Sequence, residues 1–210
     1  MLGFTYFLVC YTLLIHNSCY GGPFYNNDYY SGPGYGPGYG PGYGPEYGPG
    51  SGGKSKYRFD RAIASFVKEP TVGSVWFTPR GPNMYLNGSV AGLPPRKVLG
   101  VHIHQYGGLG NNCNDAGPHF NPFRQRHGGR TGHPRHAGDL GNIPVDEFGV
   151  MYFSLYVTLK GLGPFNGFIG RALVIHENTD DLGIFPDEGS RTTGNSGGRL
   201  ACATIGYRAP

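Results

Sequence analysis

The sequence predicts an all-β domain over residues 56–210, an antiparallel sandwich or barrel, preceded by a low-complexity arm and a short apolar leader. Three observations predict it. From about Lys56 the chain consists of short apolar runs separated by clusters of Gly, Pro, Asn and Asp, and such breaks are typical of turns between strands. Residues 149–160 alternate between apolar and polar, as a half-buried strand does. No helical period lies between the runs, which favours strands packed against strands.

Seven of the apolar runs are expected to form strands. They span residues 61–70, 73–82, 84–93, 97–107, 149–161, 172–178 and 200–207. The run from Met151 to Leu159 is the clearest, because its apolar side chains all point to one face of the strand. Two connections, 107–148 and 177–199, are too long for hairpins. We expect them to be structureless loops with a functional role.

Residues 1–19, "MLGFTYFLVCYTLLIHNSC", are interpreted as a secretory signal peptide. Their apolar run from Leu2 to Ile15 is shorter than the roughly 20 residues that span a bilayer. The start lacks Lys and Arg, and no clear small-residue cleavage site follows. The alternative is a buried N-terminal helix. No other stretch is long and apolar enough to anchor the chain in a membrane, so a secreted, extracellular protein is expected.

Residues 20–55 form an arm rich in Gly, Pro and Tyr, in which residues 32–50 read "GPGYGPGYGPGYGPEYGPG". Pro lacks an N–H and Gly adds backbone entropy, so this tract is expected to be disordered. Eight of the 16 tyrosines lie between Tyr20 and Tyr47. The arm is therefore either a spacer without a specific partner, or a segment that contacts extracellular matrix through residues 20–53.

The charge pattern argues against nucleic acid as a partner. The net charge is only +4, and the basic residues are scattered through several segments. A nucleic-acid footprint requires Lys and Arg clustered on one face.

The cysteine count predicts one disulfide. Cys10 leaves with the signal peptide, and Cys19 leaves too if cleavage follows it, so that Cys113 and Cys202 remain as an even pair in an oxidising compartment. Closing a loop of about 90 residues stabilises a fold by roughly 4–5 kcal/mol in the chain-entropy model. The alternative is two unpaired buried thiols.

The histidines indicate a metal site. One of the eight, His16, lies in the leader, and the other seven fall between residues 102 and 176. In "GVHIHQYG", His102 and His104 share one face of a predicted strand. The long connection adds four more, His119, His127, His133 and His136, with the carboxylate of Asp139 close by in sequence. Three imidazoles with one carboxylate suit tetrahedral zinc, whereas imidazoles alone in a plane suit Cu(II).

Several motifs occur in order with compatible spacing: "GVHIHQYG", "CNDAGPHFNP", "RHGG", "RHAGDLGN", "GRALVIHENTDDLG" and "TGNSGGRLACATIG". Over roughly the last 150 residues the chain thereby resembles the copper-zinc superoxide dismutase family. The resemblance implies a Greek-key β-barrel with two long functional loops. It implies copper ligands at His102, His104, His119 and His176. It implies zinc ligands at His119, His127, His136 and Asp139.

The resemblance also implies the roles of residues around the metals. His119 matches the imidazolate that bridges both ions and supplies a proton during turnover. Asp180 matches the carboxylate that hydrogen-bonds the far nitrogens of one copper ligand and one zinc ligand. Arg199 matches the cation that attracts and orients the small anion, and Cys113 with Cys202 matches the intrasubunit disulfide. His133 matches no ligand and is interpreted as a solvated loop residue.

The implied activity is dismutation of superoxide to dioxygen and hydrogen peroxide, with copper as the redox centre and zinc as a structural ion. The 177–199 connection resembles the loop whose charges shape the field around the copper. Here the match is incomplete: Asn178 stands where the family commonly has Lys, and Gly189 replaces one acidic residue while Glu188 remains. Arg191 is a candidate to replace part of the missing positive charge.

Two other functions stay open at this stage. One is a structural or matrix protein that uses the folded domain as a module and assembles through the arm. The other is a copper-binding or storage protein without turnover. The motif "NGS" at Asn87 is an N-glycosylation sequon on a predicted strand, and a homodimer is compatible with the resemblance.

Overall fold

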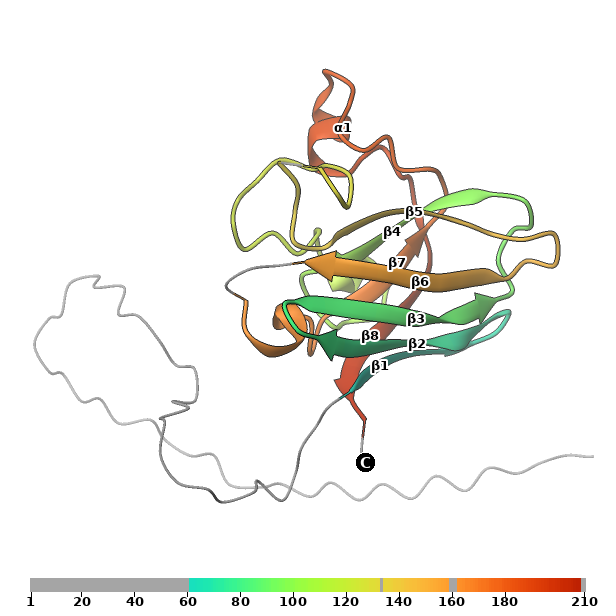
Figure 1. Ribbon diagram of the computed structural model, residues 1–210. Helices are drawn as coiled ribbons and strands as arrows, with labels where there is room; N and C mark the ends of the chain where they lie inside the picture. Colours follow the sequence, from blue (N-terminus) through green and yellow to red (C-terminus); the bar gives the residue numbers. More distant parts are fainter. Residues whose placement is uncertain (1–60, 133, 159–161, 209–210) are drawn as a thin grey trace, which may run out of the picture. The chain divides into compact units, whose positions relative to one another are not determined.

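The computed structural model describes residues 61–132, 134–158 and 162–208 (Figure 1). The predicted signal peptide, the predicted arm and the prediction for His133 lie outside these residues. The described strands are β1 Ala62–Lys68, β2 Thr71–Arg80, β3 Asn83–Ala91, β4 Val98–His104, β5 Asp139–Pro144, β6 Met151–Thr158, β7 Ala172–His176 and β8 Arg199–Tyr207. The short helices are η1 Asn114–Ala116, η2 Pro164–Gly167 and α1 Glu188–Thr192.

The strands form one antiparallel sheet in the order β5-β4-β7-β8-β1-β2-β3-β6. Its two outer strands, β5 and β6, contact each other, so the sheet curls into a nearly closed barrel. Strand β3 pairs with β6, and β4 pairs with β7. These non-consecutive pairings are the crossing connections of a Greek key. The predicted all-β fold is confirmed.

The barrel interior is apolar because apolar side chains from several strands point inward. Strand β6 shows this pattern along its whole length, with every second side chain buried from Met151 to Val157. Phe77, Leu86 and Ile205 belong to the same buried cluster and come from β2, β3 and β8. Such burial supplies most of the free energy that holds a small domain together.

Strand β5 and helix α1 correct the expectation that both long connections are structureless. Strand β5 lies inside 107–148, and its sequence "DLGNIP" is buried at four of six positions without a period of two. The missing alternation concealed it from sequence analysis. Helix α1 lies inside 177–199, and Asp187 caps it by accepting a hydrogen bond from the N–H of Ser190 at 2.8 Å.

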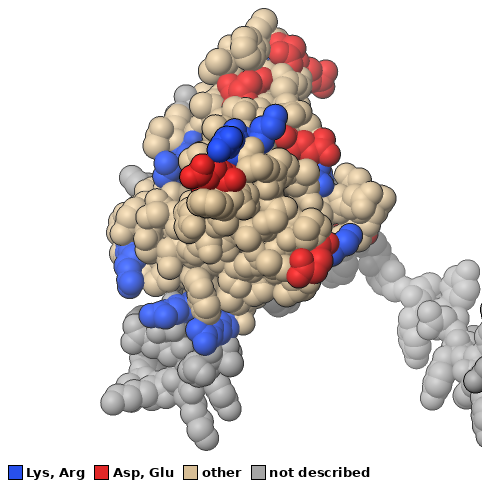
Figure 2. Space-filling model, turned by 90° about the vertical axis from the view of Figure 1, so that its right-hand side faces the viewer, with Lys and Arg blue, Asp and Glu red and all other residues tan. Residues whose placement is uncertain are grey.

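The surface carries mixed charge. On the face shown in Figure 2, acidic and basic side chains are interspersed among uncharged ones. No helix among the described residues has the length and apolar character needed to cross a bilayer.

Candidate metal centre

The predicted ligands come from four parts of the fold and meet at one end of β4. His102 and His104 lie on β4, and His176 is the last residue of β7, its neighbour. His119 forms an isolated β-bridge with His104. His127 and His136 come from the connection that leads into β5, and Asp139 is the first residue of that strand. All seven are at most 6% exposed.

Strand β4 is a rigid base for two of these side chains because it pairs on both sides, with β5 and with β7. Its pairing with β5 shifts register between Gly100 and His102. Both faces of the strand are buried at this point, since Val101 and Ile103 are 0% exposed as well. The histidine face is therefore enclosed by the two long connections.

One cluster of ring nitrogens joins His102, His104, His119 and His176. These four residues each place one possible ligand atom within 4.8 Å of the others. The Nε2 atoms of His104 and His176 are 3.1 Å apart. The Nδ1 atom of His104 donates to the carbonyl of Gly117 at 2.7 Å. Because Nδ1 carries that proton, Nε2 of the neutral ring keeps its lone pair for the cluster.

A second cluster surrounds Asp139. Its Oδ1 lies 3.1 Å from Nδ1 of His119, 3.1 Å from Nδ1 of His127 and 3.2 Å from Nδ1 of His136. Its Oδ2 accepts hydrogen bonds from the backbone N–H of Gly128 and of His136. One possible ligand atom of His102 also lies within 4.8 Å of those of His119, His127 and Asp139. His119 belongs to both clusters, which therefore adjoin each other.

Asp180 connects the clusters from behind. Its two carboxylate oxygens lie 2.9 Å from Nε2 of His102 and 2.7 Å from Nε2 of His127. Asn142 fixes this residue, because its side-chain amide donates to the carbonyl of Asp180 and accepts from its N–H. The ring orientations of His102 and His127 are thereby set from outside the clusters.

The inner nitrogens pass a test for metal binding. Nδ1 of His102 and Nδ1 of His127 are buried and lack a partner with hydrogen-bond geometry in the described part of the chain, although Nδ1 of His127 lies 3.1 Å from Oδ1 of Asp139. A buried ring nitrogen normally has a partner. Here both atoms face other nitrogen or oxygen donors, as metal ligands do. The donor set, imidazoles in one cluster and three imidazoles with a carboxylate in the other, fits copper and zinc.

Burial sets the protonation of the first cluster. Loss of solvation is the main cause that lowers the pKa of His102, His104 and His119, and it lowers that of His176 to about 4. These rings are neutral at physiological pH, as metal ligation requires.

The second cluster is protonated differently. Burial lowers the pKa of His127, but its contacts with the carboxylates of Asp139 and Asp180 outweigh that effect and raise the pKa to about 9. Burial raises the pKa of Asp139, but hydrogen bonds from the surrounding histidines hold it far below its usual range. Without metal this cluster is therefore a compact ion pair between imidazolium and carboxylate.

Arg199 starts β8 beside the first cluster. Its guanidinium donates to the carbonyls of Cys113 and Gly117 at 2.5 and 2.6 Å. The predicted disulfide between Cys113 and Cys202 is confirmed, and it ties the connection after β4 to β8 across 89 residues. Two backbone carbonyls and a covalent crosslink thus fix the position of one guanidinium.

The structure gives a reason for one departure from the family pattern. A Cβ added at Gly189 would lie 2.2 Å from the side-chain oxygen of Asn195, so a larger residue there would displace the Asn195 side chain. Glu188 and Arg191 are exposed on α1, and the exposed Asn178 follows β7. Asn87 lies in the middle of β3, half-buried between Trp76 and Ser154 of the neighbouring strands.

Sequence analysis assigned no role to two residues that support the site. Arg135 is 7% exposed, and its guanidinium donates to the carbonyls of His136 and, across to β6, of Thr158. Asn142 holds Asp180 as described above. Nothing in the sequence distinguishes either residue from an ordinary loop or strand residue, because their partners are distant or lie on the backbone.

The fold and the site define a class of protein: an antiparallel β-barrel with two adjoining clusters of possible metal donors, histidines in one and histidines with an aspartate in the other. A family model described as copper/zinc superoxide dismutase matches residues 71–205. An extracellular copper-zinc superoxide dismutase of Schistosoma mansoni is 74% identical over 152 residues, covering 72% of this chain and 83% of that protein. One of Caenorhabditis elegans is 44% identical over 146 residues, covering 70% and 66%.

A solved structure, that of the clock protein EA4, superimposes with a TM-score of 0.67 at 38% identity, covering 75% of this chain and 99% of that one. The chain belongs to the copper/zinc superoxide dismutase family.

Proposed function

We propose that this protein dismutates superoxide to dioxygen and hydrogen peroxide in an extracellular setting. The observation that carries the proposal is the pair of adjoining donor clusters that share His119. A storage protein needs one such cluster and has no use for a fixed guanidinium beside it. Relatives named extracellular copper-zinc superoxide dismutase support the same activity.

In this proposal copper is held by His102, His104, His119 and His176, and zinc by His119, His127, His136 and Asp139. Copper supplies the one-electron redox chemistry, and zinc supplies fixed charge and structure. Asp180 orients one ring of each set through its two oxygens.

Two residues of the chain act on the substrate. Arg199 binds and orients the superoxide anion, because its guanidinium is fixed on the carbonyls of Cys113 and Gly117 and retains donors for an anion. His119 directs Nδ1 toward Asp139, which leaves Nε2 for the other cluster. We assign to this Nε2 the uptake and return of the proton that the product requires.

Metal analysis of the purified protein together with a superoxide assay tests the proposal. We expect copper, zinc and dismutation in the native chain. Arg199→Ala should slow dismutation at least about tenfold without loss of copper, since one charge-assisted contact to the anion is removed. Arg80→Ala, on the exposed end of β2, is the matched control. Metal-loaded protein without activity would contradict the proposal, and unchanged activity of Arg199→Ala would contradict the role of Arg199.

We further propose secretion through the signal peptide 1–19, and contacts of residues 20–53 with extracellular matrix as the second candidate function. The Gly-Pro-Tyr repeat favours the latter because it presents many phenols on a chain that cannot build a core. Deleting residues 20–53 should abolish deposition into matrix while dismutation survives. Normal deposition of the shortened chain would contradict the second function.

Glycosylation at Asn87 and homodimer formation stay predictions. A mass shift on treatment with a glycosidase checks the first, with Asn87→Gln as the control. Sedimentation of the metal-loaded protein checks the second.

A further inference from the structure

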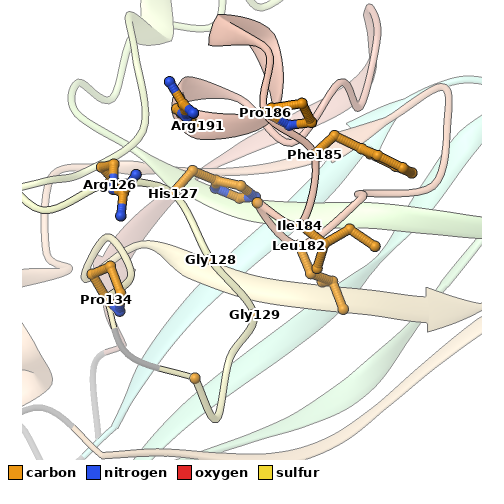
Figure 3. A pocket seen from close by; sticks show the side chains of 12 residues that line it. Arg126, His127, Gly128, Gly129, Pro134, Leu182, Ile184, Phe185, Pro186 and Arg191 are labelled. Atoms are coloured by element: carbon orange, nitrogen blue, oxygen red, sulfur yellow. The ribbon is translucent and has the colours of Figure 1, made fainter.

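A cavity of about 410 Å³ lies between the two long connections, on the outer side of the second cluster. One wall comes from Arg126–Gly129 with Gly132 and Pro134, and the other from Leu182–Pro186 with Arg191. Figure 3 shows the cavity with His127 in its middle. The His127 ring is already engaged at both nitrogens by Asp180 and Asp139. The cavity is therefore separate from the donor atoms that the proposed function uses.

One side of the cavity is apolar and open to solvent. Ile184 is 73% exposed and Phe185 is 53% exposed, although both are large apolar side chains, and Leu182 beside them is 39% exposed. Figure 3 shows these three side chains together on one side of His127. Contiguous exposed apolar side chains on a soluble domain typically mark a binding site.

The other side of the cavity is basic. Arg126 and Arg191 lie together across His127 from the apolar side chains (Figure 3). The ion pairs of the described residues include neither arginine. In the same connection, Asp181 and Asp187 each accept a hydrogen bond from Asn195, and Glu188 is exposed on α1 three residues before Arg191 without a described ion pair.

We propose that this cavity binds a small amphiphilic anion, a carboxylate with an alkyl tail. Two arginines without an acidic partner match a carboxylate head, because guanidinium groups bind carboxylates through parallel hydrogen bonds. Leu182, Ile184 and Phe185 match the tail. The volume lies within the range of about 300–1,000 Å³ that small-molecule sites occupy.

The ligand joins two segments that otherwise share few direct bonds at this place. Among the described residues, one backbone hydrogen bond joins the two walls: the N–H of His127 donates to the carbonyl of Arg191 at 2.9 Å. A carboxylate held by Arg126 and Arg191 adds a second bridge between the walls. Hydrogen exchange should therefore slow in residues 124–132 and 182–195 when the ligand binds.

Titration calorimetry of the full metal-loaded chain with decanoate tests the proposal. We expect one site for decanoate, and no binding of acetate, which lacks the tail, or of decyltrimethylammonium, which reverses the charge. Arg126→Gln and Arg191→Gln should each weaken decanoate binding about fivefold. Phe185→Ser should weaken it similarly. Arg80→Gln and Phe148→Ser are the matched controls, because both residues are exposed and lie outside the cavity.

Three outcomes would overturn the proposal. Equal binding in the Arg126→Gln/Arg191→Gln double variant would show that decanoate binds elsewhere, for example at Arg199. Equal binding of the cationic amphiphile would show an apolar surface without anion selectivity. Capture by anionic phospholipid vesicles without binding of free decanoate would show a membrane contact instead of a ligand site.

Discussion

The barrel and the two long connections are held together by different forces. The barrel has a continuous apolar cluster, in which Val75, Leu86 and Ile205 are 0% exposed. Outside β5, the described residues of the connections contribute Phe120, Ala137 and Val145 to that cluster. The connections are held in addition by contacts that converge on Asp139, Asp180 and the disulfide. Residues 111–113 even hold three consecutive positive φ angles on non-glycine residues, which is unfavourable without an external constraint. The barrel therefore folds by burial, whereas the site depends on crosslinks, polar contacts and metals.

The largest expected effect on stability comes from removing the disulfide that links the connection after β4 to the barrel. Replacing both cysteines, Cys113→Ser with Cys202→Ser, should lower the free energy of unfolding by about 4–5 kcal/mol, because the unfolded chain loses a long closed loop. Urea unfolding of the metal-free protein measures the loss. A change below about 1 kcal/mol would mean that the connection after β4 is anchored by its own turns.

The next effect concerns the barrel alone. Leu86→Ala leaves a cavity in the core and should cost about 3 kcal/mol. The loss of stability should be the same with and without metals, because Leu86 belongs to the apolar core and to neither of the two donor clusters. Val67→Ala, at a side chain that is 83% exposed, should change stability by less than about 0.5 kcal/mol. A loss that depends on metal would mean that the two regions are coupled through the core.

A smaller effect concerns the site alone. Asp180→Asn removes the acceptor behind His102 and His127 and should weaken zinc binding about 10–100-fold. Competition with a chelator measures this affinity, and stability of the metal-free barrel should change little. Asp187→Asn is the control in the same connection, because Asp187 caps α1 and contacts no histidine ring. Equal zinc affinity in both variants would contradict the orienting role of Asp180.

The last expected effect is a slope with pH instead of the cost of one substitution, namely the pH dependence of the stability of the metal-free protein. Four histidines with lowered pKa stay neutral in the fold, namely His102, His104, His119 and His176. The unfolded chain protonates them below its usual pKa of about 6.5. Their contribution to stability is therefore lost as pH falls from 6.5 toward the folded pKa, which is about 4 for His176.

His127 acts in the opposite sense, because its stabilisation is present below pH 6.5 and is lost as pH rises toward its folded pKa of about 9. Four groups outweigh one, so stability should fall between pH 6.5 and about 4.5. Thermal unfolding at several pH values measures the trend, and Leu86→Ala should shift the whole curve without changing its slope. A flat curve would contradict the buried, neutral state of these rings.

The two regions also differ in how far the sequence predicts them. The seven predicted strands are confirmed, because short apolar runs bounded by turn residues are a local signal, which alternation strengthens in β6. Strand β5 was missed because it is buried on both faces and contains Gly141 and Asp139, which break the alternation. Whether such a segment forms a strand depends on its tertiary packing, which the local sequence does not show.

The residues proposed as metal ligands could be predicted from the sequence because of their side-chain type, whereas the residues that hold them in place could not. Histidines are rare enough for a cluster in the sequence to suggest metal. The role of Asp180 came only from the resemblance, and Arg135 and Asn142 gave no signal at all. Their bonds reach from 135 to 158 and from 142 to 180, distances over which a sequence pattern carries no information about contact.

Cys113 makes two contacts that together affect the position of Arg199. Its sulfur is joined to Cys202, and its carbonyl accepts a hydrogen bond from Arg199, three residues before that partner. A newly made chain with both thiols reduced lacks the crosslink that fixes this carbonyl. Oxidation of the two thiols and the fixed position of the guanidinium thus depend on the same residue, Cys113.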